Sequence, residues 1–129
     1  MDELSRILLV EDDRDIQIVA RLALADLAGF ELEICSSGHE ALEKAPEFAP
    51  DLILLDVMMP ELDGPSTLSK LRSQSSLSET PVIFMTAKAQ PEEVAEYLRL
   101  GALDVIVKPF DPMGLGDQVR SIWDAWASS

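Results

Sequence analysis

Five residues with charged or hydroxyl side chains follow directly on apolar runs at four separate places in the chain. Glu11 and Asp12 follow the first run, Asp56 the second, Thr86 the third and Lys108 the fourth. Hard divalent cations prefer carboxylate oxygens as ligands, and the charged oxygens of a phosphoryl group accept hydrogen bonds from hydroxyl and ammonium groups. If the five side chains converge, we expect a site for metal-assisted phosphoryl transfer, with an aspartate as the nucleophile.

The five side chains converge only if the apolar runs are strands of one parallel sheet. Each run is short, is apolar throughout and is bounded by turn residues, which is typical of a strand buried on both faces of such a sheet. The runs are Ile7–Val10, Leu52–Leu55, Pro81–Met85 and Val105–Val107. Parallel strands end at one edge, and ligands bind at that edge in open α/β sheets.

Apolar residues at helical spacing separate the strands. They predict helices over about 13–28, 39–45, 65–71, 91–100 and from 111 to the end, and the alternating stretch Phe30–Cys35 predicts a half-exposed strand. Strands and helices that alternate in this way predict an α/β fold of three layers, a doubly wound parallel five-stranded sheet with helices on both faces. At 129 residues, we expect a single domain over 1–129.

Two of these helices carry specific expectations. Pro46 is predicted to end the second helix, because proline lacks an N–H group and clashes with the preceding turn. Ile18, Leu22 and Ala25 make the first helix apolar on more than one side. We interpret this as deep burial against the sheet and a neighbouring helix, with a self-association face as the alternative.

The composition excludes several classes of partner. The net charge is −14, from 24 acidic and 10 basic residues, which argues against direct binding of nucleic acid or anionic membrane.

The N-terminal stretch 1–6 lacks the pattern of a signal peptide, and no apolar run approaches the ~20 residues that span a bilayer. Cys35 is the single cysteine, which excludes an internal disulfide and favours a reducing compartment. We expect a cytoplasmic location.

Four motifs give the chain a family resemblance. It resembles the receiver domain of response regulators in two-component signalling, including the chemotaxis type, over essentially its whole length. The motifs have the order and spacing of that family, and together they are far more specific than any one alone. They are Ile7-Leu-Leu-Val-Glu-Asp-Asp13, Asp51-Leu-Ile-Leu-Leu-Asp-Val-Met-Met-Pro-Glu-Leu-Asp-Gly64, Pro81-Val-Ile-Phe-Met-Thr-Ala87 and Gly101-Ala-Leu-Asp-Val-Ile-Val-Lys-Pro-Phe110.

The resemblance implies a flavodoxin-like strand order of 2-1-3-4-5 and a role for each residue of the site. Asp56 would accept a phosphoryl group from a sensor histidine kinase or a phosphotransfer protein. A Mg²⁺ or Mn²⁺ ion would be held by Glu11, Asp12, Asp56 and the backbone carbonyl of Met58. Thr86 and Lys108 would contact the phosphoryl group, and the bond before Pro109 would be cis. The face formed by the fourth and fifth helices and the last strand would meet an output protein or domain.

One position departs from the pattern of the family. The family commonly has Tyr or Phe three residues before the lysine, and this ring turns inward when the threonine moves towards the phosphoryl group. Here the position is Val105, which has little room to change its packing. We therefore expect the switch to involve Thr86 and to be read mainly from displacement of the loop and helix over 86–100.

Other functions are consistent with parts of the pattern. A Mg²⁺-dependent phosphatase of the haloacid-dehalogenase type would also use an aspartate nucleophile, but it needs a second aspartate where this chain has Met58. A flavodoxin-like FMN carrier needs a phosphate-binding loop after the first strand, where the acidic residues 11–13 would repel phosphate. A degenerate receiver that acts only as a binding module is the remaining alternative. We expect the chain to have no enzymatic activity other than assisting its own phosphorylation and dephosphorylation. A homodimer is a further expected form of assembly.

Overall fold

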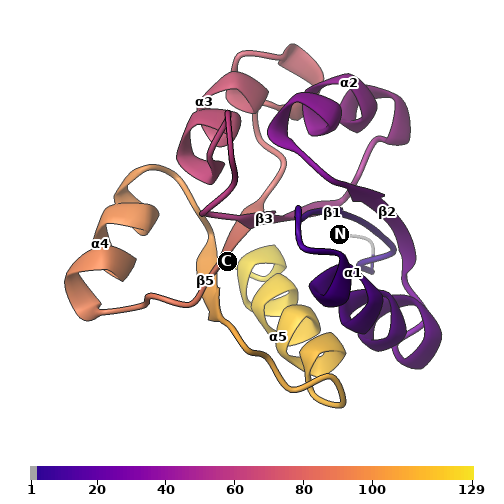
Figure 1. Cartoon of the computed structure of the whole chain (residues 1–129). Helices are drawn as coiled ribbons and strands as arrows, with labels where there is room; N and C mark the ends of the chain where they lie inside the picture. Colours follow the sequence, from indigo (N-terminus) through magenta and orange to yellow (C-terminus); the bar gives the residue numbers. More distant parts are fainter. Residues whose placement is uncertain (1–2) are drawn as a thin grey trace.

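A computed structural model describes residues 3–129, and its centre is a parallel sheet of five strands (Figure 1). Residues 1–2 lie outside the described residues. They belong to the expected domain and to the N-terminal stretch that lacks a signal-peptide pattern. The strand order is β2-β1-β3-β4-β5, and every neighbouring pair is parallel. The expected α/β fold and strand order are therefore confirmed. The strands are β1 Arg6–Val10, β2 Glu31–Cys35, β3 Leu52–Asp56, β4 Val82–Thr86 and β5 Asp104–Val107.

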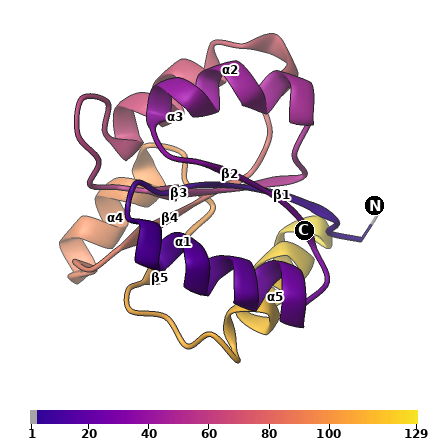
Figure 2. The same ribbon diagram turned by 45° about the vertical axis from the view of Figure 1, so that its right-hand side comes forward.

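Helices cover both faces of the sheet and make the expected three layers. Figure 2 shows α1 and α5 on one face, and α2 and α3 on the other. The helices are α1 Arg14–Arg21, α2 Gly38–Phe48, α3 Gly64–Arg72, α4 Pro91–Arg99 and α5 Leu115–Ala127, with a π-helical continuation of α1 over Leu22–Leu27 and a 3₁₀ turn at Ser75–Leu77. None of the helices within 3–129 combines the length and the apolar character that a bilayer crossing requires.

The central strands β1, β3 and β4 are apolar along most of their length because each contributes side chains to two cores. On β1, Ile7 and Leu9 pack in the core under α1 and α5, whereas Leu8 and Val10 pack in the core under α2 and α3. Successive side chains of a strand point to opposite faces, so a strand covered on both faces has no polar position. The predicted runs therefore became the strands that hold the site. The expected burial of Val105–Val107 on both faces is wrong, since β5 lies at the edge of the sheet and Val107 is 50% exposed.

The expectation that Pro46 ends the second helix is wrong, since α2 continues through it to Phe48. Proline removes the hydrogen bond that would reach back four residues to the carbonyl of Leu42. That carbonyl accepts a hydrogen bond from Nε2 of Gln74 instead, at 3.3 Å. A side chain that is distant in sequence thus replaces the missing helical bond.

The expected deep burial of the first helix is also wrong in part. Ala23 and Leu24 are buried, but the side chain of Ile18 is 67% exposed and that of Leu22 is 46% exposed. The helix changes to π geometry at Leu22. Its second apolar side therefore faces solvent and has no partner among the described residues of this chain.

Candidate functional site

Glu11 and Asp56 lie side by side because β1 and β3 pair in register. Val10 is paired with Leu55, so the next residues along the two strands are these two acids. Both are buried, with exposed fractions of 0% and 2%. Asp12 is exposed beside them, and one carboxylate oxygen from each of the three residues lies within 4.8 Å of the others. The structure thus brings together the three predicted carboxylates.

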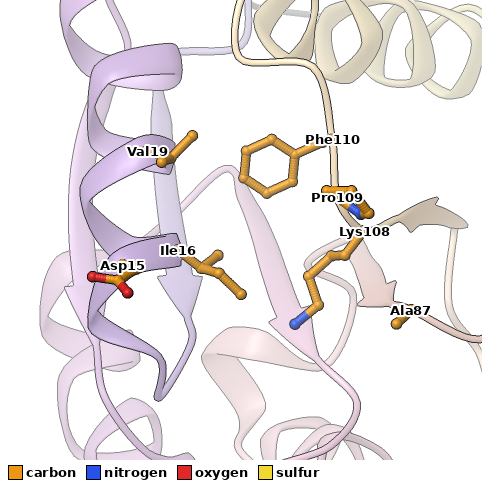
Figure 3. A pocket seen from close by; sticks show the side chains of 7 residues that line it. All are labelled: Asp15, Ile16, Val19, Ala87, Lys108, Pro109 and Phe110. Atoms are coloured by element: carbon orange, nitrogen blue, oxygen red, sulfur yellow. The ribbon is translucent and has the colours of Figure 1, made fainter.

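Lys108 reaches the carboxylates from the end of β5. Its Nζ atom lies 3.0 Å from Asp56 Oδ1 and 3.1 Å from Glu11 Oε1. The bond between Lys108 and Pro109 is cis. Figure 3 shows the lysine side chain extending towards the sheet edge, between α1 and the segment at Ala87. An apolar hollow of about 440 Å³ lies beside the lysine side chain.

Glu11 is held by its own loop as well as by the lysine. Its second oxygen, Oε2, accepts a hydrogen bond from the backbone N–H of Asp13 at 3.0 Å. The Asp13 side chain caps α1 by accepting from the N–H groups of Asp15 and Ile16. The Glu11 carbonyl accepts from Nε2 of Gln17 at 2.6 Å. The sequence reading missed Gln17, because a glutamine on a helix carries no signal of a loop contact.

Burial and neighbouring charges alter the pKa values of this group. Burial raises the pKa of Glu11 to about 7, and the negative charge of Asp56 acts in the same direction. The Asp13 N–H and the Lys108 ammonium oppose that rise. Burial lowers the pKa of Lys108, but its bonds and charge interactions with Asp56 and Glu11 outweigh burial and leave the pKa above its usual value. The ammonium therefore stays charged and holds the two buried acids together.

The loop after β3 packs closely on the backbone of Asp56. The N–H of Gly64 donates to the carbonyl of Val57 at 2.9 Å. A Cβ atom on Gly64 would lie 2.5 Å from the Asp56 carbonyl oxygen and 2.8 Å from Val57 Cα. Only glycine allows this approach. Nothing in the local sequence pattern indicates this contact of Gly64 with Asp56.

Thr86 ends β4 and is buried next to β3. Its hydroxyl oxygen accepts a hydrogen bond from the backbone N–H of Lys88 at 3.0 Å. Asp56 is paired with Met85, so Thr86 lies one position beyond Asp56 along the sheet. The hydroxyl of Thr86 thus lies at the same edge as the carboxylates and is bonded to the loop that leads into α4.

The remaining predicted positions surround this group. Met58, two residues after Asp56, is 74% exposed. Val105 is half-buried and packs against the core under α2 and α3. His39 is exposed and lies in the first turn of α2, shortly after the end of β2.

The arrangement can perform one kind of chemistry well. It presents a buried aspartate whose carboxylate is held by an ammonium group, next to two further carboxylates that provide oxygen ligands for a cation. A hydroxyl group and a backbone N–H lie on the adjacent strand end. Such a group neutralises charge on transferring phosphoryl oxygens and positions an oxygen nucleophile.

Comparison with known proteins gives consistent results. The family model described as the response regulator receiver domain matches residues 7–120. The regulatory protein AtoC of Escherichia coli is 41% identical over 111 residues, which cover 86% of this chain and 23% of that protein. The alkaline phosphatase synthesis transcriptional regulatory protein PhoP of Bacillus subtilis is 38% identical over 117 residues, which cover 91% of this chain and 48% of that protein. The chain therefore spans about a quarter to a half of these relatives.

Solved structures agree with the sequence comparison. The chemotaxis response regulator CheY4 of Vibrio cholerae has a TM-score of 0.85 and 34% identity, covering 92% of this chain and 98% of that one. The receiver domain of Francisella response regulator 1452 has a TM-score of 0.80 and 32% identity, covering 95% and 98%. Together with the family model, these matches show that the chain belongs to the receiver domains of response regulators.

Proposed function

We propose that this receiver accepts a phosphoryl group on Asp56 and changes conformation in response. The observation that carries the proposal is the ion pair between the buried Asp56 carboxylate and Lys108, at 3.0 Å. A carboxylate oxygen of Asp56 attacks the phosphorus of a phosphohistidine on a sensor kinase or phosphotransfer protein. The P–N bond breaks, its electron pair returns to the imidazole, and an aspartyl phosphate forms.

The acidic residues fit a hard divalent cation. Carboxylate oxygens of Glu11, Asp12 and Asp56 lie within 4.8 Å of one another, and oxygen ligands are those that Mg²⁺ and Mn²⁺ prefer. These three side chains and the backbone carbonyl of Met58 would hold the ion. A bound cation supplies charge neutralisation for the phosphoryl oxygens and relieves repulsion among the acids.

Two further residues receive the transferred group. Lys108 can donate its ammonium hydrogens to a phosphoryl oxygen, because its Nζ atom already lies at the Asp56 carboxylate. Thr86 can donate its hydroxyl hydrogen to a second phosphoryl oxygen. We propose that the hydroxyl moves to make that contact and gives up the hydrogen bond that it accepts from the N–H of Lys88. The switch is therefore built into the same residues that bind the phosphoryl group.

The domain would act as a signalling module without turnover of a separate substrate. It would assist only its own phosphorylation and the hydrolysis of its own aspartyl phosphate, in the cytoplasm. Its partners would be the kinase or phosphotransfer protein and an output protein or domain, which meets the face of α4, β5 and α5. We expect no direct contact of this domain with nucleic acid or membrane, given its net charge of −14. A second copy of the chain is a further candidate partner.

The proposal is tested by incubation with acetyl phosphate and Mg²⁺, followed by intact mass. We expect a gain of one phosphoryl group in the wild-type chain and none in Asp56→Asn, which preserves the side-chain volume. Absence of the gain in a folded wild-type chain would favour a receiver that serves only as a binding module. Continuous hydrolysis of phosphate esters would contradict a signalling role.

A further inference from the structure

Helix α4 is attached to the sheet mainly through one side chain. None of its residues is buried. Within the described chain, Tyr97 is the only residue of α4 that packs against either hydrophobic core. Figure 1 shows α4 at the side of the molecule, beside β5. A helix with so little buried apolar surface can shift at small cost in free energy.

The side chain of Tyr97 packs on β4. Its ring lies 5.3 Å from the ring of Phe84, centre to centre, at 69° between the planes, which is the edge-to-face arrangement that aromatic pairs favour. Phe84 is fully buried and lies two residues before Thr86. Residues two apart on a strand share a face. Tyr97 therefore packs on β4, on the same face of the strand as Thr86.

Val105 on β5 is paired with Phe84 on the neighbouring strand β4. Both residues and Tyr97 belong to one hydrophobic core. The aromatic ring next to Phe84 thus comes from α4, and β5 contributes only a small aliphatic side chain. Because Val105 cannot rotate a ring in or out, the aromatic group free to change its packing here is Tyr97.

The loop between Thr86 and α4 provides a mechanical link. The N–H of Lys88 donates to the Thr86 hydroxyl at 3.0 Å, and α4 begins three residues later at Pro91. An open hollow of about 500 Å³ is lined by 87–90 together with Glu92 and Glu93. The loop can therefore move without displacing packed side chains.

We propose that Tyr97 is the aromatic residue that reports phosphorylation in this receiver. The inference rests on the proposed phosphorylation of Asp56. When the Thr86 hydroxyl turns to the phosphoryl group, the N–H of Lys88 loses its acceptor and the loop shifts. The shift displaces α4, and the Tyr97 ring changes its packing on Phe84. The output partner then meets a repositioned α4.

Tyr97 is the single tyrosine of the chain, so a fluorotyrosine label reports on this ring alone. We would label the full chain with 3-fluorotyrosine, add Mg²⁺ and acetyl phosphate, and record ¹⁹F spectra and intact mass on the same samples. We expect the resonance to move as the phosphoryl group is gained and to return as it is lost. The degree of phosphorylation of Thr86→Ala is measured by intact mass. In this phosphorylated variant we expect the Tyr97 resonance to stay at its unphosphorylated position.

A second label tests whether the change is local. Trp123 and Trp126 lie on α5, on the opposite face of the sheet, and their rings pack on each other. In a 5-fluorotryptophan sample their resonances should move much less than that of Tyr97. Equal movement of all three rings would overturn the inference.

The mass measurement separates this inference from the proposed function. A full gain of one phosphoryl group with an unmoved Tyr97 resonance would overturn the role of Tyr97 and leave the role of Asp56 intact. A folded wild-type chain that gains no phosphoryl group would overturn both.

Discussion

The ammonium nitrogen of Lys108 lies 3.0 Å from Asp56 Oδ1, although 52 residues separate the two positions in the chain. The ion pair is enclosed, since the lysine side chain is 14% exposed and the aspartate side chain 3%. The charge that would stabilise a phosphoryl group is therefore in place before the group arrives, which lowers the reorganisation needed during transfer.

Replacement of Lys108 by Gln should slow phosphorylation of Asp56 by acetyl phosphate about 10- to 100-fold, because hydrogen bonds to charged groups contribute about 1.5–3 kcal/mol. The rate is measured by intact mass over time. Lys70→Gln, at an exposed lysine near the end of α3, is the matched control and should react at the wild-type rate. Equal rates for all three proteins would contradict the role of the ammonium group.

Replacement of Gly64 by Ala should lower both stability and phosphorylation. The new Cβ would lie 2.5 Å from the Asp56 carbonyl oxygen, so the backbone of the acceptor must move. Overpacking of this kind costs about 1–3 kcal/mol in the free energy of unfolding. Gly116→Ala is the control, because its Cβ would clash with Ala28 at 2.6 Å, away from the site. It should lose stability in urea but keep the wild-type phosphorylation rate per folded molecule.

Addition of Mg²⁺ should stabilise the folded chain. An ion that binds only the folded state adds about 2.7 kcal/mol at a concentration 100 times its Kd. Urea unfolding with and without Mg²⁺ measures the gain. Asp12→Asn should reduce it, whereas Asp13→Asn should retain it, because asparagine also caps helices and the Asp13 side chain is engaged with α1. A gain that is lost in Asp13→Asn and kept in Asp12→Asn would place the ion elsewhere.

The thiol of Cys35 should be inert in the folded chain. Burial raises its pKa to about 12, compared with an ordinary value of 9.0, and the nearby Glu40 charge adds to the rise. Alkylating reagents attack the thiolate. At pH 8 the buried thiol therefore stays protonated and forms far less thiolate than an ordinary thiol. We expect alkylation by iodoacetamide only in urea, and rapid reaction of the folded chain would contradict the burial of Cys35.

Much of this molecule could be predicted from local pattern. The apolar runs predicted the positions of four strands, and the rule that parallel strands end at one edge predicted that Asp56 and Lys108 would meet. The contacts that escaped prediction depend on the path of the chain in three dimensions. The bond from Gln74 that lets α2 pass through Pro46 has no local signal. Neither has the approach of Gly64 to Asp56, which depends on the path of a loop in three dimensions.

The exposed side of α1 escaped prediction for a different reason. Ile18 and Leu22 have the spacing of a buried face, and pattern alone cannot tell a core within the chain from a surface that faces solvent. The role of Tyr97 was hidden in the same way. Its contact with Phe84 follows from the placement of α4 beside β5 and close to β4, which no residue spacing specifies.

The central claim, that Asp56 is the phosphoryl acceptor, is tested most directly by trapping the product. Borohydride reduces an aspartyl phosphate to homoserine, which peptide mass spectrometry locates in the chain. After treatment with Mg²⁺ and acetyl phosphate, we predict homoserine at position 56 and aspartate at positions 12 and 13. Homoserine at either of those two positions, or at none in a folded and phosphorylated sample, would contradict the account.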